Sequence, residues 1–149
     1  MATPSSLNTL IDLAHKDTDE AAKQLGAALR AGDEAAQKLD LLMQYRNDYA
    51  ERCQSNLTTG ISTTHFNNFQ VFMQKLDNAI SGQQKVVSDT QQRIAQARAV
   101  WQTCEQKKMS FVTLAERATK EQSRRELWRD QKQNDEYAAR CSQPKRTPS

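Results

Sequence analysis

Apolar residues recur at heptad spacing along the first part of the chain. One series is wholly apolar, and its members are Leu7, Ala14, Ala21, Ala28, Ala35, Leu42 and Tyr49. The second series contains polar or small interruptions, and its members are Ile11, Thr18, Leu25, Gly32, Leu39, Arg46 and Cys53. These are the d and a positions of a coiled-coil helix, which we predict over residues 1–58. The slim Ala side chains at d indicate that a partner helix approaches closely.

The heptad pattern is interrupted between Asn56 and Thr64 by four Thr, one Ser, one Asn and one Gly. Such side chains compete for backbone hydrogen bonds and favour turns and helix caps. We therefore predict a turn over residues 59–64. Gly60 can take a positive φ after a helix end, and Ser62, Thr63 or Thr64 is a candidate N-cap for the next helix.

The heptads resume after the turn and predict a second helix over residues 65–140. Its a positions are Met73, Ile80, Val87, Ile94, Trp101, Lys108 and Ala115, and its d positions are Phe69, Leu76, Gln83, Thr90, Ala97, Cys104, Phe111 and Ala118. Residues 119–136 are mostly charged or amide, with Leu127 and Trp128 as exceptions. We expect a disordered tail over residues 141–149.

The predicted fold is all-α, an antiparallel coiled-coil hairpin whose second helix is longer and projects. We call the packed a and d residues between the two helices the seam. If the chain reverses near residue 60, residue 5 lies opposite about residue 115, so the apolar seam residues of the second helix end where the first helix ends. Roughly twenty residues of the second helix then extend as a polar overhang from about residue 119. A polar helix without a packing face is marginal in water, so either this overhang frays or a partner holds it, and we favour the partner.

Composition agrees with long helices and excludes several classes of protein. All three Pro lie at the ends of the chain, as Pro4, Pro144 and Pro148. No stretch resembles a membrane span or a secretory signal, so we expect a cytoplasmic protein without membrane insertion. The three widely spaced cysteines favour reduced thiols over a disulfide framework or a metal knuckle.

Charge is distributed unevenly. Residues 1–58 carry net −3, residues 59–116 net +2 and residues 117–149 net +4. This pattern suits the helix macrodipole, and a basic end that binds a partner is the other interpretation. Nucleic acid is disfavoured as the partner because acidic residues are interleaved with the basic ones. The interleaved residues are Lys120, Glu121, Arg124, Arg125, Glu126, Arg129, Asp130, Lys132, Asp135 and Glu136.

Sequence motifs for catalysis are absent. The chain has no phosphate-binding glycine loop and no nucleophile elbow. Its two histidines, His15 and His65, are fifty residues apart and near opposite ends of the first predicted helix, where they cannot share a metal. We interpret the chain as noncatalytic, with no cofactor and no metal.

Aromatic residues flank the seam near the turn. Tyr45, Phe72, Ala79 and Lys38 occupy g positions, which come together on one side of an antiparallel pair. Two interpretations are open: Tyr45 and Phe72 broaden a narrow coiled coil, or they form an apolar docking strip for another protein.

Three stretches resemble one known family. The stretch at the turn holds Gly60-Ile61-Ser62, Asn68-Phe69, Phe72-Met73, Leu76-Asp77, Ala79-Ile80 and Gln83. The stretch near the end of the chain holds Asp130-Gln131-Lys132, Asp135-Glu136-Tyr137-Ala138 and Arg140. The stretch near its start holds Leu7-Asn8-Thr9-Leu10-Ile11-Asp12-Leu13-Ala14, Ala21-Ala22 and Leu25-Gly26. In order, spacing and total length they resemble the FliJ family of flagellar export proteins, nearly end to end.

The resemblance implies a component of the flagellar type III export apparatus, at the inner face of the cell membrane, similar to the central stalk of rotary ATP synthases. Implied partners are the hexameric export ATPase, the cytoplasmic domain of the export gate and export chaperones. Implied gate-binding residues are Lys38, Leu42, Tyr45, Tyr49, Phe72, Leu76, Ala79 and Gln83. Implied ATPase-binding residues are Arg124, Arg125, Arg129, Lys132, Asp135 and Glu136.

The match has small departures. Lys38 and Gln83 are less apolar than their neighbours, and Cys104 and Cys141 belong to no motif of the family. Two alternatives stay open: the stalk of a virulence type III secretion system, which the Gly60 to Gln83 motif disfavours, and a basic coiled coil that binds nucleic acid.

Overall fold

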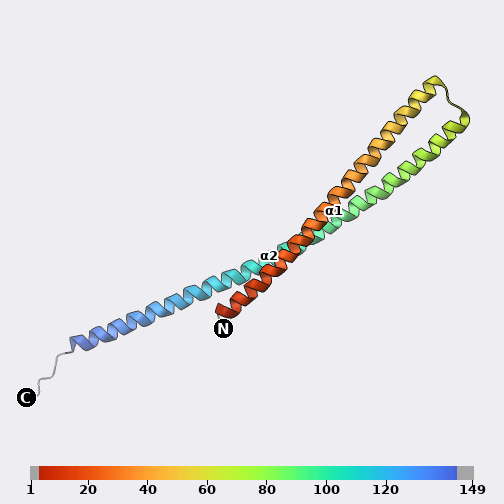
Figure 1. Ribbon diagram of the computed structural model, residues 1–149. Helices are drawn as coiled ribbons and strands as arrows, with labels where there is room; N and C mark the ends of the chain where they lie inside the picture. Colours follow the sequence, from red (N-terminus) through yellow and green to blue (C-terminus); the bar gives the residue numbers. More distant parts are fainter. Residues whose placement is uncertain (1–3, 144–149) are drawn as a thin grey trace, which may run out of the picture. The chain divides into compact units, whose positions relative to one another are not determined.

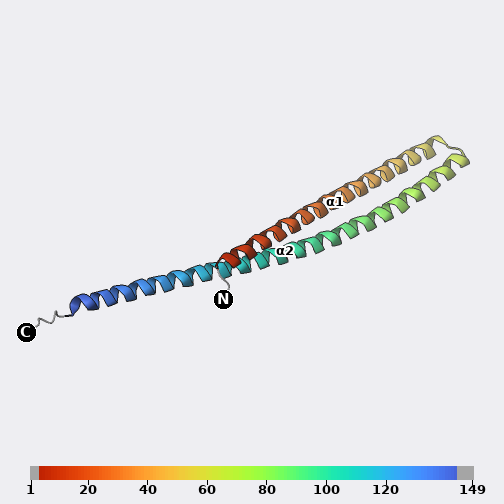
Figure 2. The ribbon, with the colours of Figure 1, turned by 60° about the horizontal axis from the view of Figure 1, so that its bottom comes forward.

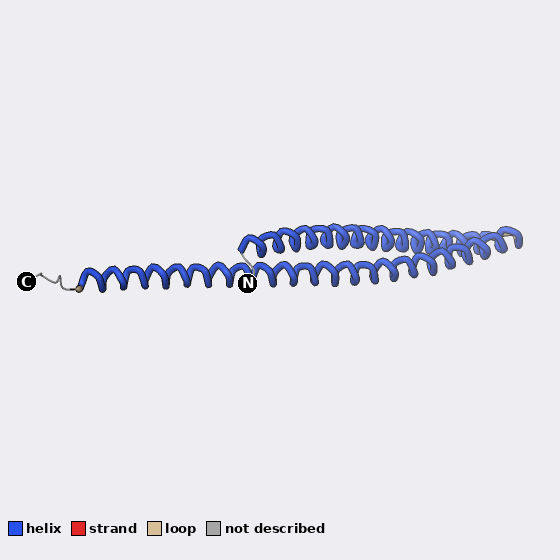
Figure 3. Tube along the Cα trace, turned by 90° about the horizontal axis from the view of Figure 1, so that it is seen from below, coloured by secondary structure: helices blue, strands red, loops and turns tan. Residues whose placement is uncertain are grey.

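The computed structural model describes residues 4–143 as two long α-helices joined by a short turn (Figures 1 and 3). Helix α1 spans Pro4–Thr59 and helix α2 spans Thr63–Ser142. The predicted all-α fold, with a longer second helix, is confirmed. The described residues pack as two units: unit 1 joins residues 4–17 to residues 104–143, and unit 2 holds residues 18–103.

Unit 2 is an antiparallel helical hairpin in which α1 and α2 lie side by side (Figures 1 and 2). From Thr18 to Cys53 every a and d residue of α1 in this unit is buried or half-buried except Arg46. Every a and d residue of α2 from Phe69 to Trp101 is also buried or half-buried. The heptad assignment made from the sequence is therefore confirmed.

The seam of unit 2 is built mainly from small side chains. Its buried residues are Thr18, Ala21, Ala35, Cys53, Ile80 and Thr90. A Cβ added at Gly32 would lie 2.8 Å from Ile94 Cδ1, closer than such atoms can pack. Gly32, which interrupts the apolar a series in the sequence, therefore provides the space that Ile94 occupies.

Unit 1 pairs the start of α1 with the second half of α2. Leu7 and Ala14 are buried there, and Phe111, Ala115 and Ala118 of α2 are half-buried. From residue 119 to residue 143 every side chain is exposed. Within unit 1, α2 thus continues as a polar helix beyond its packed part, as the sequence predicts.

The turn is shorter than the predicted 59–64 and comprises residues 60–62. Gly60 has φ 89°, the positive value expected after a helix end. Of the three candidate N-caps, Ser62 has the capping geometry, because its Oγ accepts a hydrogen bond from the backbone N–H of His65 at 3.3 Å. The hydroxyl of Thr59, the last residue of α1, donates a hydrogen bond to the carbonyl of Asn56 at 3.1 Å.

The C-terminal boundary of α2 corrects the prediction of a disordered tail over residues 141–149. Cys141 and Ser142 are helical, and the Ser142 hydroxyl donates to the Ala139 carbonyl at 3.0 Å. The helix ends here because a residue before proline disfavours the α conformation, and Pro144 follows. Residues 144–149 of the predicted tail, and residues 1–3 of the predicted first helix, lie outside the described residues.

Neither helix, over its described length, has a stretch apolar enough to cross a membrane. The cysteines are free thiols: Cys53 is buried, Cys104 half-buried and Cys141 exposed.

We predict different consequences of adding one methyl group at two glycines of α1. Gly26→Ala should raise the free energy of unfolding by about 0.5–1 kcal/mol, because helical alanine is favoured and a Cβ there meets nothing within 4 Å. Gly32→Ala should raise the free energy of unfolding by less than this, or lower it, because the Ile94 side chain must move to admit the added Cβ. Urea denaturation followed by circular dichroism measures both variants, and equal stabilisation would show that the seam does not need a glycine at 32.

Candidate protein-docking surfaces

The eight residues implied to bind the export gate all lie in unit 2, and we refer to them as the turn-proximal strip. The strip consists of Lys38, Leu42, Tyr45 and Tyr49 of α1 with Phe72, Leu76, Ala79 and Gln83 of α2. Their d and g positions place them in the seam and along one of its two flanks. Leu42, Tyr49, Leu76 and Gln83 are half-buried, whereas Lys38, Tyr45, Phe72 and Ala79 are exposed.

An aromatic cluster joins the two helices within the strip. The ring of Tyr49 stacks on Phe69, with centroids 4.5 Å apart and planes 1° apart. The ring of Tyr49 also contacts Phe72 at 4.5 Å with a tilt of 52°. Phe69, which the sequence places only as a seam residue, is therefore the base on which Tyr49 rests.

The cluster bears on both interpretations of the aromatic flank. Phe72 broadens the coiled coil through its contact with Tyr49, yet 44% of its surface is exposed. Tyr45 is 62% exposed. The contacts that broaden the seam thus leave a large apolar area available to another protein.

Gln83 has a structural contact that explains its polarity. Its amide donates a hydrogen bond to the Ala35 carbonyl on the other helix at 3.0 Å. A backbone carbonyl that is already part of α1 therefore receives an additional donor across the seam. No sequence pattern signals this bond, because the acceptor is a backbone atom.

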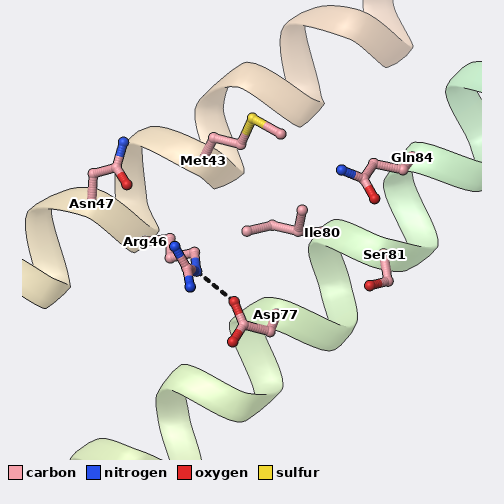
Figure 4. A pocket seen from close by; sticks show the side chains of 7 residues that line it. All are labelled: Met43, Arg46, Asn47, Asp77, Ile80, Ser81 and Gln84. Carbon is pink, nitrogen blue, oxygen red and sulfur yellow. Dashed lines mark hydrogen bonds and ion pairs between the residues drawn. The ribbon is translucent and has the colours of Figure 1, made fainter.

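The opposite flank of unit 2 carries a groove of about 420 Å³ that the sequence did not indicate. Met43, Arg46, Asn47, Asp77, Ile80, Ser81 and Gln84 line it (Figure 4). Arg46 and Asp77 point toward one another across the groove and form an ion pair between α1 and α2. Arg46, an exposed a residue of unit 2, thus has a partner on the other helix.

The six residues implied to bind the ATPase lie in unit 1, on the exposed part of α2, and we refer to them as the basic segment. They are Arg124, Arg125, Arg129, Lys132, Asp135 and Glu136. Arg125 forms an i,i+4 ion pair with Glu121 at 2.9 Å. The ammonium group of Lys132 lies 5.4 Å from the centroid of the Trp128 ring. The segment therefore combines charge with exposed apolar side chains.

Those apolar side chains are large. Leu127 is 69% exposed, Trp128 64% and Tyr137 71%. Unit 1 also has an open groove of about 370 Å³ that the sequence did not reveal, between the start of α1 and α2. Its lining residues are Ile11, Val112, Ala115, Glu116, Thr119 and Lys120.

Metal-binding geometry is not found among the described residues, where no three His, Cys, Asp or Glu side chains gather. The described parts of the two units present aromatic rings, aliphatic side chains and charged groups on the surfaces of their helices.

Comparison with known proteins identifies the family. The family model described as the flagellar FliJ protein matches residues 4–147. The chain belongs to the FliJ family. Flagellar FliJ proteins of Salmonella typhi and Escherichia coli K12 are each 32% identical to it over 145 residues, covering 97% of this chain and 99% of each relative.

FliJ membership confirms the resemblance drawn from the sequence. The chain is therefore a component of flagellar protein export. It also favours the flagellar system over the virulence secretion stalk that the sequence left open.

The two phenylalanines that contact Tyr49, one in the seam and one on its flank, should differ in their effect on stability. Phe69→Ala should lower the free energy of unfolding by about 2 kcal/mol, because it removes a half-buried ring and the Tyr49 stack. Phe72→Ala should cost under about 1 kcal/mol, since much of that ring is in water. Urea titration of both variants tests this, and a larger loss for Phe72→Ala would show that Phe72 is chiefly a structural residue.

Proposed function

We propose that this chain is a noncatalytic binding component of the flagellar export apparatus with two docking surfaces. The turn-proximal strip binds the cytoplasmic domain of the export gate, and the basic segment binds the hexameric export ATPase. Through these contacts it assists delivery of export chaperones and their substrates. It acts in the cytoplasm, at the inner face of the cell membrane at the flagellar base.

The observation that carries this proposal is the exposed aromatic pair Tyr45 and Phe72 on a packed helical scaffold. Large aromatic residues are the usual energetic centres of protein interfaces. Because Tyr49 rests on Phe69 and contacts Phe72, the Phe72 ring is supported before a partner arrives. A surface that is already ordered loses little conformational entropy when it binds.

The exposed length of α2 supports the second surface. A helix whose side chains are all exposed from residue 119 to residue 143 has no packing of its own to stabilise it. Arginines beside an exposed Trp128 and Leu127 are the combination that protein interfaces favour. A partner that covers this helix would supply the missing packing.

A binding component without an active site acts on an ATPase only through differential affinity. If the basic segment binds one state of the ATPase ring better than another, it shifts the ring toward that state. Faster assembly or turnover then results without any catalytic group contributed by this chain.

We predict that the strip determines capture of the gate domain. Phe72→Ala combined with Leu76→Ala should weaken binding about ten-fold or more, as expected for central interface residues, and should reduce helicity far less. Val71→Ala is the matched control, because Val71 is next in sequence and 54% exposed. Calorimetric titration with the purified gate domain measures the affinities. Equal loss of binding and helicity, or an equal effect of Val71→Ala, would reject the docking role.

We predict that the basic segment determines binding to the ATPase. A chain that ends at Ala118 should no longer co-purify with the ATPase or raise its turnover, because every exposed residue of the segment is removed. The same chain should still bind the gate domain, which provides the internal control. Replacing Arg124 and Arg129 with Gln should weaken ATPase binding in the full-length chain. Unchanged stimulation by the shortened chain at saturating amounts would overturn this assignment.

A further inference from the structure

The seam of unit 2 leaves the relative register of its helices weakly determined by packing. Heptad positions repeat, so sliding one helix past the other by seven residues again places a and d residues in the seam. Few of the buried side chains are large. The turn offers little resistance, because Thr and Ser residues around it have low helix propensity and can unwind.

One ion pair distinguishes the observed register from its neighbours. Arg46 of α1 pairs with Asp77, which occupies an e position of α2 (Figure 4). The e positions before and after it are all amides, namely Gln70, Gln84 and Gln91. A slide by one heptad in either direction would therefore place Arg46 opposite a glutamine instead of a carboxylate.

A second contact favours the same register independently. Ile94 occupies the space left by Gly32, the only glycine at an a or d position of the described helices. A slide by one heptad would place Leu25 or Leu39 opposite Ile94, and Val87 or Trp101 opposite Gly32. The hole would then lie against the wrong residue and large side chains would meet.

The ion pair is adjacent in sequence to the turn-proximal strip. Arg46 follows Tyr45, and Asp77 follows Leu76. The pair lies on the e flank of the seam, while Tyr45 and Phe72 occupy the g flank. Arg46 and Asp77 can therefore set how the two halves of the strip are aligned without belonging to the docking surface.

We propose that Arg46 and Asp77 are positioning residues, whose ion pair selects the helix register that assembles the turn-proximal strip. This proposal rests on the proposed gate-binding function of the strip. Both side chains are about half exposed, at 44% and 51%, so the pair contributes little to overall stability. Its effect is to add to the contact of Ile94 with Gly32 in favouring one register over the heptad-related alternatives, as single polar residues do in coiled coils.

The register can be measured directly by the distance between two spin labels. Cysteines replace Gln44 and Gln92, exposed residues of α1 and α2, in a chain whose three native cysteines are substituted and which binds like wild type. A slide by one heptad displaces the labels by about 10 Å along the helices. Combining Asp77→Gln with Gln84→Asp moves the carboxylate by one heptad, and we expect a second distance population. Arg30→Gln, which removes an exposed charge from the outer face of α1, is the control and should leave one population.

Binding to the gate domain is measured on the same variants. Apparent affinity should fall in proportion to the fraction left in the native register, which for one exposed pair corresponds to about two- to five-fold. A variant with exchanged charges, Arg46→Asp with Asp77→Arg, keeps an ion pair at this site. In contrast to the variant with the moved carboxylate, it should show the single native label distance and the wild-type affinity for the gate domain. Loss of stability alone would not produce this parallel rescue.

The outcomes separate the two proposals. A single native distance in the variant with the moved carboxylate overturns the positioning role, as does a second population without loss of binding or a charge exchange that fails to rescue. If wild type itself does not bind the gate domain, the proposed function of the strip fails, while the label distances still decide whether the ion pair selects the register.

Discussion

The close approach of α1 and α2 is the constraint on which the rest of the molecule depends. Small residues at the seam, with Gly32 as the extreme case, let the two backbones come together so that Ile94 packs directly against α1. A slim seam buries little apolar surface per heptad, and stability must accumulate over many turns of helix. Long helices are therefore a consequence of the small side chains as much as of helix propensity.

A narrow seam also explains why both flanks carry chemistry. Two helices cannot cover their own g and e positions, so aromatic residues at g keep a large exposed area while packing partly on each other. On the e flank, Arg46 and Asp77 join the helices without entering the core. One flank is thus suited to a partner and the other to alignment of the two helices.

In unit 1 the packing of α2 ends because its partner helix runs out. Beyond residue 119, α2 has only exposed side chains, held in part by local pairs such as Arg125 with Glu121 and Lys132 with Trp128. Local pairs of this kind contribute a few tenths of a kcal/mol each, roughly, which is small beside the packing of a seam. The same lack of packing that weakens the helix leaves arginine and tryptophan side chains accessible to another protein.

The sequence by itself determined the helices, their heptad positions, the turn with Gly60, and the aromatic flank. It could do so because helical periodicity, glycine and capping residues act over a few neighbouring positions. Only the tertiary structure decided that Ser62 is the cap, that Gly32 receives Ile94, that Gln83 bonds to the Ala35 carbonyl and that Arg46 pairs with Asp77. The last three contacts join residues 31 to 62 positions apart, and the Ser62 cap is one of three candidates that the sequence makes equivalent. No local pattern encodes which heptad of one helix lies opposite which heptad of the other.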